Sequence, residues 1–151
     1  EAVNIIVEDN YVGKAQAIGI NLERSLKQLQ DKFPNTIREV RGSGALWGII
    51  IDPGLLGKVF EGMSKLLPGK IFKDERLIIK IFTASVISHL YDKHRVLTFF
   101  GSNEDIPLLI SFPLIAEKKE INIFIKALEE TFSVGLLKLT SKFIKNKLSI
   151  K

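Results

Sequence analysis

The residues that could do chemistry are few in this chain, and their spacing does not form a known catalytic set. The two histidines, His89 and His94, stand five positions apart. A metal-binding pair on a helix uses positions i and i+4, and no third ligand is evident here. The chain has no cysteine, which excludes disulfides and thiolate ligands. We therefore interpret both histidines as surface or half-buried residues, and we predict no metal site.

Lys80 is the one lysine whose neighbours could favour covalent chemistry. Apolar residues flank it between positions 78 and 82, and burial among them would lower the pKa of its ammonium group toward the range of Schiff-base lysines. The favoured interpretation is a lysine at the margin of an apolar helix face that extends to water. Glu129 and Glu130 diverge by about 100° on a helix, so they indicate a solvated edge and not an acid–base pair.

A glycine-rich segment, Arg41-Gly-Ser-Gly-Ala-Leu-Trp-Gly48, invites a phosphate-binding interpretation. It lacks the full spacing of a dinucleotide fingerprint, and it precedes a strand where a phosphate loop would open a helix. We therefore interpret Gly42 and Gly44 as parts of a turn. Gly48 falls inside the following strand, where a missing side chain lets another group pack close to the sheet.

The apolar pattern predicts the elements that would position these groups. Residues 1–8 are read as the end of a helix, and a second helix begins after a cap at Asp9 or Asn10 and ends at Pro34. Further helices are expected at about 55–67, at about 73–93 and from Glu117 onward. The sequence predicts strands near residues 37–41, 45–51, 95–100 and 107–112.

These elements predict an α/β (α+β) fold with two layers, in which helices pack on a mainly antiparallel sheet of about four strands. Residues 45–51 are apolar on both faces, so we expect a central strand that is covered on both sides. The last two predicted strands are consistent with a hairpin. In the helix at 73–93 the residues with helical spacing are Leu77, Ile81, Ala84, Ile87 and Tyr91.

The net charge of +5 comes from the end of the chain. Residues 133–151 hold five lysines and no acid, and the remainder has 17 basic and 17 acidic residues. A neutral body has no electrostatic footprint for nucleic acid. We therefore expect a main unit at residues 1–132 and a basic amphipathic tail or linker at 133–151, with Leu137, Ile144 and Leu148 on its apolar side. Such segments can also lie on membranes or acidic partners.

Targeting features are not apparent in the sequence. No apolar run reaches the roughly 18 residues that a membrane helix needs, so we predict no membrane span. The chain opens on Glu1 without a signal segment, which suggests a piece of something longer. The cytoplasm is the expected compartment.

The order of these features resembles the small C-terminal domain of class III, fold-type I, pyridoxal-phosphate-dependent aminotransferases. That family carries an Arg-Gly-x-Gly-Leu-x-x-Gly segment, then a helix leading to a strand, an Arg-x-x-Pro-Pro-Leu-like segment and a terminal helix. The similarity covers about residues 1–132 and rests on two short segments, 40–49 and 109–114. Its motif residues in this chain are Arg41, Gly42, Gly44, Gly48 and Pro113.

Two departures from the family pattern bear on function. The family's aldimine lysine, pyridine-binding acid and phosphate loop lie upstream of the matching region, so the resemblance implies no catalytic or cofactor-binding residue in this chain. Where many members place an arginine that holds the substrate carboxylate, this chain aligns Leu109, and Phe112 replaces the first proline. The resemblance thus implies that Leu109 lines a substrate site for a decarboxylated, aldehyde or carrier-bound substrate.

The resemblance implies a substrate-lining domain, inactive by itself, whose partner is the large pyridoxal-phosphate domain of the same polypeptide in a homodimeric parent enzyme. The alternative is an independent α/β module that binds another protein or a small ligand. Residue chemistry alone leaves both hypotheses open.

Overall fold

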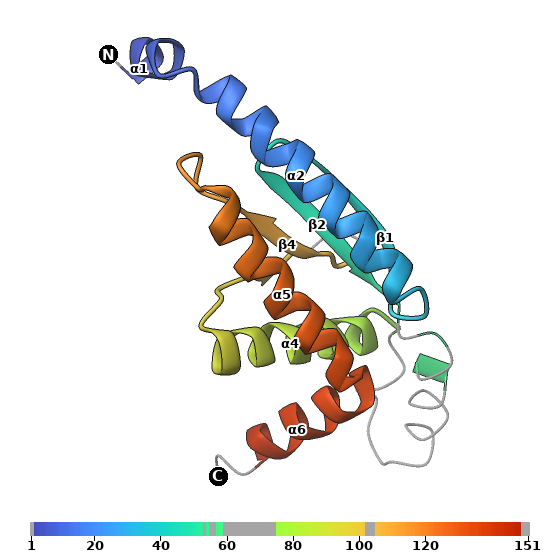
Figure 1. Cartoon of the computed structure of the whole chain (residues 1–151). Coiled ribbons are helices and arrows are strands. Elements are labelled where there is room, and N and C mark those ends of the chain that lie inside the picture. Colours follow the sequence, from blue (N-terminus) through green and yellow to red (C-terminus); the bar gives the residue numbers. More distant parts are fainter. Residues whose placement is uncertain (1, 53, 55–56, 59–74, 102–104, 149–151) are drawn as a thin grey trace.

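The computed structural model describes residues 2–52, 54, 57–58, 75–101 and 105–148, and it has helices packed on a four-stranded antiparallel sheet (Figure 1). This confirms the predicted two-layer fold. The predicted helix at 55–67 lies largely outside the described residues. The elements are α1 (Ala2–Glu8), α2 (Tyr11–Lys32), β1 (Ile37–Ser43), β2 (Leu46–Ile51), α4 (Glu75–His94), β3 (Phe99–Phe100), β4 (Leu108–Ser111), α5 (Lys118–Val134) and α6 (Leu136–Leu148).

The strand order is β1-β2-β4-β3, and each neighbouring pair is antiparallel. Strand β2 is therefore an inner strand, as predicted, and every residue from Trp47 to Ile51 is buried. The hairpin of β3 and β4 is also confirmed. In Figure 1, α2 and α5 lie side by side across one face of this sheet.

Helix α2 is fixed at both ends by local chemistry. The side chain of Asn10 accepts a hydrogen bond from the Gly13 N–H at 3.3 Å, which satisfies one free donor of the first turn. Phe33, just before Pro34, forms the other cap. The buried face of the helix consists of Ile18, Gly19, Leu22, Leu26 and Leu29.

The main core lies between the sheet and the helices. Alternate residues of the inner strands point into it, namely Trp47, Ile49 and Ile51 from β2, with Leu108 and Ile110 from β4. They pack with the buried faces of α2, α4 and α5. From α5, the buried side chains are Ile121, Phe124, Ala127, Leu128, Thr131 and Phe132.

The five residues with helical spacing in α4 do not form its most buried face. Tyr91 is 50% exposed, and Leu77, Ile81, Ala84 and Ile87 are half-buried. The helix is apolar nearly all round, so its sequence has little contrast between faces, and packing against several partners decides which side is covered. Its fully covered positions include Ile78, Phe82, Val86 and Leu90.

The strand predicted at 95–100 is shorter than expected. Arg95 takes a left-handed conformation with φ of 57°, and the Val96 N–H donates back to the Leu90 carbonyl at 3.2 Å. These contacts are typical of a helix C-terminus and divert this backbone from the sheet. Pairing with β4 therefore begins only at Phe99.

Helix α6 packs against α4. Leu136 and Leu139 are buried in the main core, and Thr140 is buried with its hydroxyl 3.2 Å from that of Ser85 on α4. Leu137, expected on the apolar side, is 49% exposed, so the predicted stripe of this helix is out of phase with its packing. Whether residues 133–151 form a separable unit stays a prediction. Within the described residues, no helix is long and apolar enough to cross a membrane.

Candidate functional site

One row of residues crosses all four strands on the face opposite α2 and α5. Arg41 pairs with Gly48, Gly48 with Leu109, and Leu109 with Phe99. Partners directly opposite in a sheet project to the same face. Because Trp47 and its alternate neighbours point into the core, this row points away from it.

The row contains a hollow at Gly48. A cavity of about 480 Å³ is lined by both strands of the β1–β2 hairpin, at the end next to its turn, and by residues at the start of β4. A Cβ atom placed on Gly48 would lie 3.2 Å from Pro107 Cβ and 3.7 Å from Leu109 Cδ2. The absence of a side chain at Gly48 therefore leaves space at the bottom of the cavity. The lining residues are Arg41, Gly42, Ser43, Leu46, Trp47, Gly48, Pro107 and Leu109. Three predicted motif residues and Leu109 thus meet at one cavity.

The single charged residue among those lining residues is already paired. Arg41 Nη2 lies 3.0 Å from Asp105 Oδ2, while Arg38 Nη2 lies 2.5 Å from Asp105 Oδ1. Hydrogen bonds from Arg38 and Arg41 hold the pKa of Asp105 below its usual value. Glu39 lies 4.0 Å from Arg41, so the two arginines face two carboxylates and the cluster is neutral overall.

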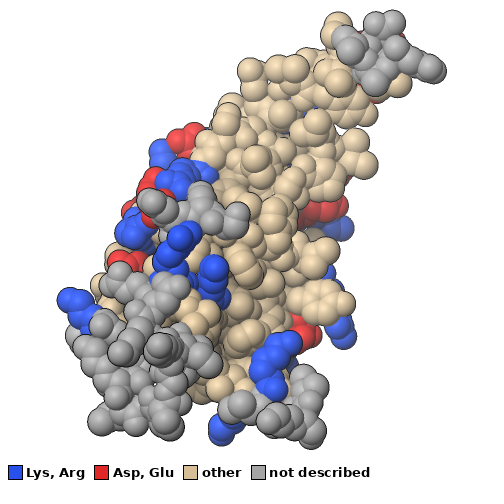
Figure 2. Space-filling view, turned by 180° about the vertical axis from the view of Figure 1, so that it is seen from behind, with Lys and Arg blue, Asp and Glu red and all other residues tan. Residues whose placement is uncertain are grey.

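The rest of this face is largely uncharged. Figure 2 views the molecule from behind and shows a broad tan surface, with Asp and Glu side chains mainly along its edges and Lys or Arg side chains both at the edges and nearer the middle. Leu46 is 55% exposed and Phe99 is 54% exposed. An apolar surface of this kind is typical of a contact or ligand-binding face.

Gly44 and Pro113 lie outside the cavity. Gly44 has φ of 55° at the tip of the hairpin, where its carbonyl accepts a 2.9 Å hydrogen bond from Trp47 Nε1. It touches α2, because a Cβ atom on Gly19 would lie 2.9 Å from Gly44 Cα. Pro113 lines a separate cavity of about 250 Å³ beside α5. The predicted turn role of Gly44 agrees with this geometry.

The other groups singled out in the sequence do not join the cavity. His89 and His94 face each other with ring centroids 6.2 Å apart, and Lys80 is exposed on α4. Burial, with Lys142 and His94 nearby, lowers the pKa of His89. In the described part of the chain, no three His, Asp or Glu side chains are grouped closely enough to hold a metal ion.

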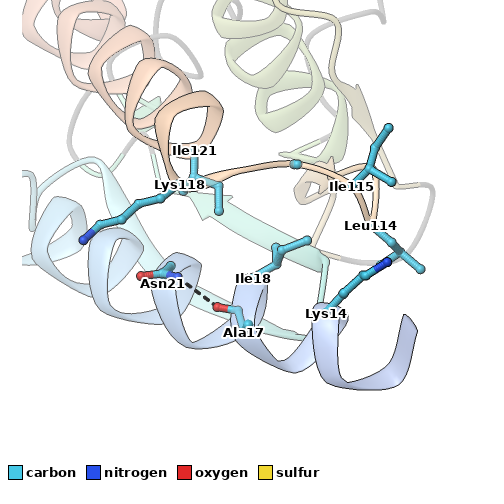
Figure 3. A pocket seen from close by; sticks show the side chains of 9 residues that line it. Lys14, Ala17, Ile18, Asn21, Leu114, Ile115, Lys118 and Ile121 are labelled. Carbon is cyan, nitrogen blue, oxygen red and sulfur yellow. Dashed lines mark hydrogen bonds between the residues drawn. The ribbon is translucent and has the colours of Figure 1, made fainter. Parts of the chain in front are cut away.

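A second cleft, of about 410 Å³, lies between α2 and the segment before α5 and was not predicted from the sequence. Figure 3 shows Ile18 from α2 and Ile121 from α5 pointing into it. No local pattern could have revealed it, because its walls come from segments about a hundred residues apart and meet only in the fold.

Neither cavity fits pyridoxal phosphate as a complete site. An aldimine site needs a lysine opposite a carboxylate, together with an anion-binding loop. The described lining of the 480 Å³ cavity has no lysine, and the 410 Å³ cleft has two lysines and no carboxylate.

Comparisons of the sequence and of the structure with known proteins point to the same class of protein. No protein-family model matches the chain. Aminotransferase PigE from Serratia sp. (strain ATCC 39006) is 25% identical over 148 residues, which cover 83% of this chain and 17% of that protein. The chain is therefore similar in sequence to an aminotransferase, which confirms the predicted resemblance to aminotransferases.

Solved structures with a similar fold belong to the same class, the transaminases. A transaminase from the marine bacterium Virgibacillus matches with a TM-score of 0.64 at 17% identity, covering 92% of this chain and 27% of that one. An S-selective transaminase from Arthrobacter sp. with alanine bound matches with a TM-score of 0.61 at 21% identity, covering 90% and 27%. The chain has the fold of a transaminase segment. It spans only about a quarter of the length of these two structures, and a smaller share, 17%, of the curated relative.

Proposed function

We propose that this chain is the C-terminal small domain of a class III pyridoxal-phosphate-dependent aminotransferase. In this proposal it completes the substrate side of an active site whose cofactor-binding residues belong to the large domain of the same polypeptide, in a homodimeric parent. The similarity to aminotransferases over most of this chain, but over small parts of the longer proteins, supports the proposal.

The row Arg41–Gly48–Leu109 is the observation that carries the proposal. Helices cover one face of the sheet, whereas the opposite face bears a cavity at the two segments that resemble the family. A small domain that works on its own would be expected to cover such an apolar face. A domain that closes over a substrate held elsewhere needs this face free.

The polarity of the cavity supports a particular class of substrate. The family resemblance aligns Leu109 with the position where many members hold a carboxylate, and Arg41 is engaged by Asp105 and Glu39. No unpaired cation is left among the described lining residues. We propose that the substrate group that reaches this cavity is uncharged, as in an amine, an aldehyde or a carrier-bound acyl chain.

A cofactor titration of the isolated chain tests whether the cofactor-binding residues lie outside it. We expect scattered, substoichiometric labelling after pyridoxal phosphate is added and imines are trapped with borohydride, because exposed lysines form weak, nonspecific imines. Peptide mapping identifies the labelled positions. A single saturable site at Lys80, with a micromolar dissociation constant or about −8 kcal/mol, would make the chain a cofactor-binding protein in its own right and refute the proposal.

A further inference from the structure

The cleft between α2 and the segment that leads into α5 has an apolar floor and a lysine at each end. Its floor and walls include Ala17 and Ile18 from α2, with Leu114, Ile115 and Ile121 from the other side. Its volume of about 410 Å³ lies in the range of small-ligand sites. Figure 3 shows Lys14 and Lys118 at opposite ends of this floor.

Neither lysine has a carboxylate partner among the described residues. The Lys14 ammonium lies 4.5 Å from the ring centre of Tyr11, an interaction that leaves its charge uncompensated. Lys118 is exposed at the first turn of α5, where the backbone N–H groups add positive potential.

The acids beside Lys118 in the sequence make hydrogen bonds at the helix end. The Glu117 side chain accepts from the backbone of the first turn of α5, and Glu120 Oε2 accepts from the Glu117 N–H at 2.9 Å. This capping box turns both carboxylates toward the helix end. Asn21 likewise donates to the Ala17 carbonyl at 3.0 Å. The unpaired positive charge of the cleft therefore remains available to a ligand.

We propose that this cleft binds a single amphipathic anion, a medium-length apolar chain that ends in a carboxylate. The chain would lie on the floor formed by Ile18, Ile121 and Leu114, and the anionic group would contact Lys14 or Lys118. The site shares no lining residue with the cavity at Gly48. It is therefore independent of the proposed substrate site, and it requires neither the cofactor nor the parent's activity.

Octanoate is the probe, added to the 151-residue chain below its micellar concentration. Amide NMR shifts should map to residues 17–21 and 114–121, with a dissociation constant of about 1 mM or tighter. Octylamine should bind more weakly, because its ammonium meets two lysines. Each methylene removed from the probe should weaken binding by up to about fourfold, which corresponds to ~0.8 kcal/mol per buried CH₂.

Charge variants provide the decisive comparison. Lys14→Gln and Lys118→Gln should each weaken octanoate binding by roughly two- to fivefold, the range of exposed ion pairs, and should leave octan-1-ol binding unchanged. Lys138→Gln and Lys145→Gln, exposed on α6, are the matched controls and should have no effect.

Three results would overturn the proposal. The first is unchanged octanoate affinity in the Lys14→Gln/Lys118→Gln double variant, with folding confirmed by circular dichroism. The second is amide shifts that map to residues 41–48 and 107–109. The third is sedimentation of the chain with phosphatidylglycerol vesicles that depends on the same two lysines, which would identify a lipid surface as the occupant.

Discussion

A graded series of glycine substitutions tests whether the hairpin geometry is as the structure has it. Gly42, Gly44 and Gly48 stand close in sequence, yet each is a glycine for a different reason. A Cβ atom on Gly42 would lie 2.4 Å from the Leu46 carbonyl oxygen and 2.6 Å from Trp47 Cα. These are backbone atoms of the paired strand, so no side-chain rotation can relieve the overlap.

The expected costs follow from these contacts. Gly42→Ala should destabilise by about 3 kcal/mol, the upper part of the range for overpacking. Gly44→Ala meets no atom closer than 3.5 Å, but its φ of 55° costs about 1–2 kcal/mol for an L-residue. A less flexible unfolded chain offsets about 0.4–1 kcal/mol of that cost. Gly48→Ala should stay within about 1 kcal/mol of the parent, because strand propensity favours alanine and Pro107 must yield only slightly.

Urea and thermal unfolding of the four proteins measure this order. For a chain of this size each kcal/mol shifts Tm by roughly 2–4 °C, so Gly42→Ala should lower it by about 6–12 °C. Trp47, the one tryptophan, reports on the site through its fluorescence and near-ultraviolet circular dichroism. Equal stability of Gly42→Ala and Gly48→Ala would refute the strand register of the hairpin.

Three further predictions address α6, pH and specificity. Leu139→Ala should cost about 2–5 kcal/mol and Leu137→Ala about 0.5 kcal/mol or less, by urea unfolding; a truncated chain without α6 that keeps full stability would instead support a separable tail. Because burial and Lys142 lower the pKa of His89, the unfolded state takes up its proton more readily. Stability from this group should be complete above about pH 6.5 and decline as the pH falls below it, and a His89→Gln variant that keeps the same slope would contradict this. In the longer enzyme, Leu109→Arg should shift kcat/KM toward carboxylate-bearing amino donors by about tenfold or more, and an unchanged ratio would remove Leu109 from the substrate site.

Local sequence was enough to predict where α2 and α5 begin and where α2 ends. Asn10 and Pro34 bound α2 through interactions within a few residues, and the contrast between apolar and charged positions is strong in α2 and α5. The glycine-rich turn and the antiparallel hairpins were predicted for the same reason. Turn residues and the apolar pattern of a strand are both features of short segments.

Tertiary structure decided the features that depend on distant segments. Helix α4 is apolar on nearly all sides, so only its neighbours determine that Phe82 is covered and Tyr91 is exposed. Asp105 meets Arg38 and Arg41 because β4 inserts beside β2, an order of strands that no local pattern specifies. The row through Gly48 and the cleft between α2 and α5 arise in the same way. Periodicity encodes which face of an element is apolar, whereas the pairing of faces far apart in the chain is fixed only when the whole core packs.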